Sequence, residues 1–93
     1  GINKKLLRIQ KVVLLELEKV FPDGLTGSEL AKRTDRNLLT IRPRTTELKL
    51  LGLITDTETT RKNDGGKPEI VYKLRAKDIV KYVEYYGLQK YQK

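Results

Sequence analysis

The chain has 93 residues, of which 20 are Lys or Arg and 12 are Asp or Glu, so its formal net charge is +8 and its pI is about 9.8. It contains no Cys and no His, which excludes disulfides, thiolate zinc sites, thiol catalysis and the commonest general base. A chain of this size supports one domain with one modest core, and its positive excess favours a polyanionic partner.

No stretch reaches the roughly 20 apolar residues of a membrane span, and no secretory signal pattern is present. We therefore expect a cytoplasmic protein without a membrane partner. The first residue is Gly1 rather than Met, which leaves open that the chain belongs to a longer protein. Positive charge exceeds negative charge in residues 1–11, 31–49, 61–67 and 73–93, whereas residues 12–30 are net acidic.

The first element is an amphipathic helix. Leu6, Ile9, Val13 and Leu17 recur at helical spacing, and the stretch Pro22-Asp23-Gly24 predicts the turn that ends it. Two further apolar residues lie outside this stripe and need cover from another surface. They are Val12 and Leu15.

A short second helix is predicted by the stretch Thr26-Gly27-Ser28-Glu29, which matches a capping box. In this motif the Thr26 hydroxyl accepts from the amide of Glu29, and the Glu29 carboxylate accepts from the amide of Thr26. The helix would carry Leu30 inward and end at the turn formed by residues 34–37.

A third helix is expected to begin near Thr40 and to end at Gly52, with Ile41 and Leu48 facing the core. This start places Pro43 in the first turn, where its missing amide hydrogen costs little. A start at residue 37 would put the proline inside the helix and is the less favourable solution.

A β-hairpin follows, because residues 53–60 are rich in β-branched side chains and residues 69–74 alternate with period two. Ile70, Tyr72 and Leu74 are expected to share one face. Residues 61–67 connect the strands, with Asp64-Gly65-Gly66 as the turn signal.

The last predicted element is an amphipathic helix that ends at Gly87. An intrachain fourth helix and a contact across a two-fold axis would both cover its apolar face. The tyrosines between Tyr82 and Tyr91 suit an interface, because each combines a large apolar area with a polar tip. We expect a homodimer, with an interface formed by Val12, Leu15, Ile79, Tyr82, Val83 and Tyr86.

Residues 24–31 and 47–54, followed by the charged hairpin and residues 71–74, closely resemble a winged helix-turn-helix. The stretch 40–48 is similar to small winged-helix proteins of bacteriophages and prophages. This resemblance covers residues 6–74 and implies an α+β, mostly α fold, with a three-helix core and a β-hairpin wing, as a winged helix-turn-helix domain over 1–74. The extra C-terminal helix, over 75–93, lies outside this pattern and is expected to dimerise or to cover the core.

A helix-turn-helix presents the N-terminal part of its second helix to base edges in the major groove. If Ile41 and Leu48 point inward, the opposite half of the third helix carries basic and hydroxyl side chains. A basic hairpin tip can reach phosphates or the minor groove. The predicted DNA-binding residues are Ser28, Thr40, Arg42, Pro43, Arg44, Thr46, Lys49, Arg61, Lys62 and Lys67. The alternative is that these residues form an ordinary solvated surface.

The sequence thus favours sequence-specific binding of double-stranded DNA by a small prokaryotic or phage transcriptional regulator, with residues 40–51 as the recognition helix and 61–67 as the wing tip. One alternative is an interaction module of a replication or other assembly that binds an acidic protein partner. Another is the DNA-targeting domain of a larger enzyme. No cofactor, metal site or catalytic residue is expected, since Asp56 and Glu58 lack a third ligand and Ser28 lacks a base.

Overall fold

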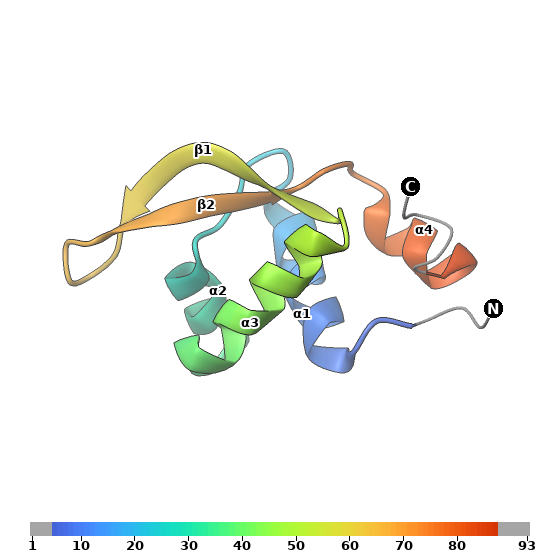
Figure 1. The fold of residues 1–93 in the computed structure, drawn as a ribbon, viewed down its shortest axis with the longest axis horizontal. Helices are drawn as coiled ribbons and strands as arrows, with labels where there is room; N and C mark the ends of the chain where they lie inside the picture. The colour runs from blue at the N-terminus through green and yellow to red at the C-terminus, as the bar shows by residue number, and fades with distance from the viewer. Residues whose placement is uncertain (1–4, 88–93) are drawn as a thin grey trace.

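In the computed structural model, which describes residues 5–87, four helices and one hairpin follow one another along the chain (Figure 1). They are α1 (Arg8–Val20), α2 (Gly27–Thr34), α3 (Leu38–Leu50), β1 (Ile54–Lys62), β2 (Pro68–Leu74) and α4 (Ile79–Tyr86). The fold is α+β and mostly helical, in a winged-helix-like arrangement with an additional C-terminal helix, as predicted. Tyr91 and the predicted outer domain limits, 1 and 93, lie outside the described residues.

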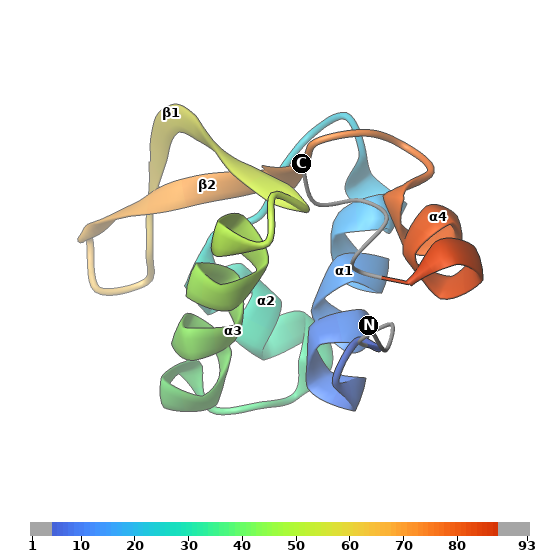
Figure 2. The same ribbon diagram turned by 45° about the vertical axis from the view of Figure 1, so that its right-hand side comes forward.

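One apolar core joins the helices to the base of the hairpin. Its fully buried members include Leu14 of α1, Leu30 of α2 and Leu48 of α3, and Leu74 closes it from β2. The hairpin runs over the helices, and its tip extends past α2 and α3 in both views (Figures 1 and 2). The tip is therefore free to contact a ligand that lies along α3.

Helix α4 packs on α1, on the side away from α3 (Figure 2). Ile79, Val80 and Val83 of this helix belong to the same core as the first three helices. The expectation that Ile79 and Val83 face a second chain needs correction, because they are 1% and 3% exposed within a single chain. Burial of these side chains makes α4 a core-covering element.

The structure confirms the capping box at the start of α2. The Thr26 hydroxyl accepts from the Glu29 amide at 3.1 Å, and the Glu29 carboxylate accepts from the Thr26 amide at 2.9 Å. Two amides that would otherwise lack partners are thus satisfied at this helix end.

Helix α3 begins two residues earlier than predicted, at Leu38. The side chain of Asn37 caps it by accepting from the Leu39 amide at 2.7 Å, and the Asn37 carbonyl accepts from the amides of Thr40 and Ile41. Pro43 consequently lies inside the helix rather than in its first turn, which corrects the sequence expectation. The helix tolerates it because Leu39 and Pro43 are exposed, so water can reach the carbonyl that loses its bond.

The hairpin pairs antiparallel from Ile54–Leu74 to Lys62–Pro68, with an irregularity in β1 between Asp56 and Thr60. Residues 61 and 62 thus belong to a strand rather than to the connecting loop. Ile70 is 39% exposed although Leu74 is buried, because Ile70 lines an open groove between the wing and α3. Of the face predicted for β2, only Leu74, at the base of the hairpin, is therefore fully buried.

A third segment joins the hairpin at its base. Leu25 and Tyr72 exchange backbone hydrogen bonds of 2.8 and 2.9 Å. This close approach requires glycine at position 24, where a Cβ atom would lie 2.2 Å from the Tyr72 carbonyl oxygen. The turn after α1 is thereby fastened to the wing, defined here as residues 54–74.

Candidate nucleic-acid interface

The outer half of α3 carries the side chains predicted to face DNA. Arg42, Pro43, Thr46 and Lys49 are all exposed; Pro43 and Thr46 lie opposite the buried Ile41, and Arg42 and Lys49 lie on one flank. The Thr46 hydroxyl donates to the Arg42 carbonyl at 3.3 Å. Thr40 is also exposed, but it lies on the other flank of the helix from Arg42.

Arg44 has a different environment from Arg42. Its Nε lies 2.7 Å from Oε1 of Glu47, and its Nη2 donates to Oε2 at 2.8 Å. Gln10, a buried residue of α1, donates to the same carboxylate at 3.1 Å. The hydrogen bonds from Arg44 and then Gln10 lower the pKa of Glu47. Arg44 therefore holds the Glu47 carboxylate in place on α3, and the Gln10–Glu47 hydrogen bond connects α3 to α1.

Arg61 is likewise held by contacts within the chain, although its side chain is exposed. Its guanidinium donates to both carboxylate oxygens of Glu29, at 2.8 and 2.6 Å, and to the Gly24 carbonyl at 2.9 Å. The pKa of Glu29 is lowered, chiefly by the hydrogen bond from Arg61. This residue connects β1 to the start of α2 and to the turn before it.

The wing tip, residues 62–67, presents two exposed lysines. Lys62 and Lys67 flank a turn in which the Asn63 side chain accepts from the amides of Gly65 and Lys67 at 2.9 and 3.0 Å. Asp64 forms a 2.6 Å ion pair with Lys32 of α2. The local hydrogen bonds fix the tip, so the two lysines project from a defined turn.

Ser28, predicted to contact phosphate, is bound to a carboxylate from the wing. Its backbone amide donates to Glu69 at 3.0 Å, and its hydroxyl donates to the other oxygen of the same carboxylate. Asn63 donates to Glu69 at 2.7 Å. Burial raises the pKa of Glu69, but the hydrogen bonds from Ser28 and Asn63 outweigh it, and the pKa is lowered overall.

Two shallow grooves bring these elements together along β2. The first separates α3 from the wing and is lined by Arg42 and Thr46 on one side and by Glu69 and Ile70 on the other. The second lies between α2 and the wing tip. Its lining includes Ser28, Lys32, Lys62 and Lys67. Helix α3, the wing and the start of α2 therefore line two neighbouring grooves, which the Ser28–Glu69 contact joins.

Sequence reasoning missed two exposed apolar residues on α3. Leu39 and Leu50 are 74% and 82% exposed. The sequence signal was present, because both lie on the helix face opposite Leu48. It was lost for Leu39 because the helix was expected to begin one residue later, at Thr40.

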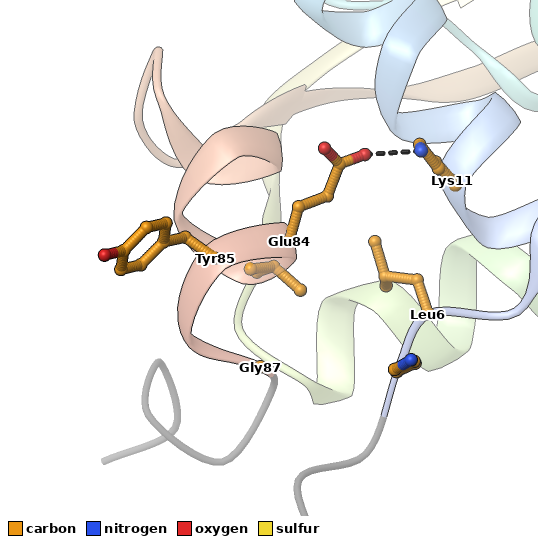
Figure 3. A pocket seen from close by; sticks show the side chains of 7 residues that line it. Leu6, Lys11, Glu84, Tyr85 and Gly87 are labelled. Atoms are coloured by element: carbon orange, nitrogen blue, oxygen red, sulfur yellow. Dashed lines mark ion pairs between the residues drawn. The ribbon is translucent and has the colours of Figure 1, made fainter.

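A separate cleft lies between the start of α1 and α4 (Figure 3). Lys11 and Glu84 form a 2.5 Å ion pair across it, and Leu6, Val83 and Tyr85 contribute to its lining. These residues offer no nucleophile with an adjacent base.

Over residues 5–87, no three His, Cys, Asp or Glu side chains come together as a metal site. None of the helices in this range is long and apolar enough to cross a membrane.

Comparison with known proteins agrees with the fold. No protein-family model matches the sequence, and no curated protein does. Among solved structures, the chain is similar to a possible transcriptional regulator from Methanosarcina mazei Go1, with a TM-score of 0.68 and 15% sequence identity over 92% of this chain and 70% of that one. At this identity the similarity shows the fold, a winged-helix-like arrangement shared with a possible regulator.

Proposed function

We propose that this protein binds double-stranded DNA and acts as a small transcriptional regulator of a prokaryote or phage. The observation that carries the proposal is which of its cations form ion pairs within the chain and which do not. Arg44 pairs with Glu47, and Arg61 pairs with Glu29. Within residues 5–87, by contrast, the cations on the exposed face of α3 and at the wing tip form no ion pair. They are Arg42, Lys49, Lys62 and Lys67.

The cations of α3 and those of the wing tip, which form no ion pair, match the two parts of a DNA duplex that such a surface can contact. An α-helix fits the major groove, where Arg42 can donate to O6 and N7 of guanine or to a phosphate. Lys62 and Lys67 belong to the wing tip, which extends past α2 and α3 (Figure 1), so they can neutralise phosphates beside that groove. Phosphate contacts fix the position of the protein, and contacts to bases supply specificity.

A salt titration on random-sequence duplex DNA tests this proposal. If the four cations contact phosphates, the logarithm of the binding constant should fall with the logarithm of salt concentration with a slope of about −3 to −4. Selection of bound duplexes from a random pool should then enrich a motif. Absence of binding even at low salt would overturn the proposal.

We further propose that the regulator is a homodimer that binds two half-sites about one helical turn apart. Support comes from the exposed tyrosines of α4, since Tyr85 is 82% and Tyr86 46% exposed and their rings contact edge to face. Val12 and Leu15 of α1 are half-buried. Sedimentation should show a dimer, and the Tyr85→Ala variant should dissociate more readily. A protein that remains monomeric well above micromolar concentration would refute the homodimer.

The second candidate is a winged-helix module that binds an acidic protein segment with the same surface. The exposed leucines of α3, Leu39 and Leu50, favour it, because apolar side chains on a helix can insert into an apolar groove of a partner protein while the surrounding cations attract its acidic residues. Failure to bind duplex DNA, with capture of an acidic peptide, would favour this function over the first.

A further inference from the structure

The outward face of α3 carries a line of side chains that we name the α3 stripe: Leu39, Pro43, Thr46 and Leu50. At 100° per residue these four positions fall within about 60° of one another, opposite Ile41 and Leu48. All four are exposed. Two leucines at 74% and 82% exposure are not explained by the fold, because the core already has fully buried residues on the other side of this helix.

The two leucines differ in their position along the helix. Leu39 is the second residue of α3, in the turn capped by Asn37, and Leu50 is the last residue, about 16 Å away along the axis. Recognition helices bring their N-terminal residues to the base edges. Leu39 and Pro43, one turn apart, therefore lie where base contacts are made, and Leu50 lies outside that region.

The chemistry of α3 limits which bases it can read. It contains no Asn or Gln, and the Asn37 side chain is used by its cap, so the bidentate contact to adenine is unavailable. Arg44 is bound to Glu47. Of the two arginines of α3, Arg42 therefore remains available to contact guanine. The apolar group that a base presents in the major groove is the 5-methyl of thymine.

We propose that Leu39, with Pro43 beside it, reads the 5-methyl groups of thymine at base steps next to a guanine contacted by Arg42. The inference rests on the proposed DNA binding and specifies its substrate as duplex sites with thymines on the major-groove edge. The cations Arg42 and Lys49 both lie on one flank of the α3 stripe, and Arg42 lines the groove toward the wing, so the phosphates of a duplex would be attracted beside the apolar contact.

The test replaces the thymines of a selected duplex by deoxyuridine, which removes the methyl group and retains the Watson–Crick pairing. Loss of one buried methyl should weaken binding about fourfold, a factor estimated from the transfer free energy of a CH₂ group. In the Leu39→Ala variant the thymine and deoxyuridine sites should bind equally. Leu50→Ala is the matched control, because it removes an equally exposed leucine from the same stripe, and it should keep the fourfold difference.

The outcomes separate this inference from the proposed function. Specific binding with no effect of deoxyuridine, or an effect that persists in Leu39→Ala, would overturn methyl reading and leave DNA binding intact. Absence of duplex binding at low salt would overturn both and would assign the α3 stripe to a protein contact. Circular dichroism of both alanine variants should match the parent, since each substitution is on an exposed helix position.

Discussion

Glu69 on β2 accepts hydrogen bonds from both the backbone amide and the hydroxyl of Ser28, so an acidic side chain of the wing caps the second helix. A carboxylate at this helix end satisfies an amide and interacts favourably with the helix dipole. It also occupies the position at which Ser28 was expected to meet a phosphate. The wing is therefore oriented by a contact that places one negative charge on the proposed DNA surface.

Replacing that charge should strengthen binding to DNA. We expect Glu69→Gln to raise affinity for random duplex about two- to fivefold, the size of one exposed charge–charge interaction. Fluorescence anisotropy at fixed salt measures the change. Glu58→Gln is the matched control, because it removes the same charge from an exposed position on β1. An equal gain for both variants would attribute the effect to net charge rather than to the position of Glu69.

Arg42 and Arg44 should respond differently to alanine substitution. Arg42→Ala should cost about 1–3 kcal/mol of binding to a selected site and less on random DNA, if the side chain reads a base. The melting temperature of the Arg42→Ala variant should stay close to that of the parent protein. Arg44→Ala should lower the melting temperature, because it removes the partner of Glu47 and disturbs the link to Gln10. The reverse pattern would contradict the assignment.

The two lysines of the wing tip should contribute to affinity without regard to sequence. Lys62→Ala with Lys67→Ala should reduce the magnitude of the salt slope by roughly two, one unit for each phosphate contact. The control is the double alanine variant of Lys77 and Lys81, which loses the same charge near and on α4. An unchanged slope in the wing variant would show that the tip does not contact DNA.

Gly24 should be essential for attaching the wing. Gly24→Ala would place a Cβ atom 2.2 Å from the Tyr72 carbonyl oxygen and 2.8 Å from a Val71 methyl, so the bridge to Tyr72 must open. We expect a loss of about 1–3 kcal/mol in unfolding free energy, together with faster hydrogen exchange at the Leu25 amide. Gly65→Ala serves as control, since its Cβ would lie 3.4 Å from its nearest contact. Equal effects would refute the steric explanation.

Stability should decrease in acid because Glu29 and Glu69 have lowered pKa values in the folded protein. A folded-state pKa below the unfolded one means that the stabilisation is present above the ordinary glutamate pKa of about 4.3. It is lost as the pH falls through the folded-state pKa. Urea unfolding at a series of pH values from 7 to 3 measures this, and Glu29→Gln should flatten the profile. A profile identical to that of the parent would exclude Glu29 as a contributor.

Much of the fold was determined by local sequence. The capping box at Thr26 and Glu29 and the helix end at Gly52 depend on residues within three or four positions, so the sequence contains all the partners. Helix α3 begins at Leu38 rather than near Thr40, because the cap that Asn37 supplies outweighs the cost of an internal Pro43. That gain outweighed the cost because Pro43 lies on an exposed face.

The candidate site depended more on tertiary structure. The sequence placed Arg42 and Lys49 on the outer face of α3, because the helical period relates them to the buried Ile41. It could not show that Arg61 is held inside the protein's own network, since the Glu29 carboxylate that binds Arg61 lies 32 positions away in the chain. The Arg44–Glu47 pair is local, three residues apart on one helix. Pairing between distant residues is decided by packing of the folded chain, which is why only the tertiary structure showed that Arg61 is already bound.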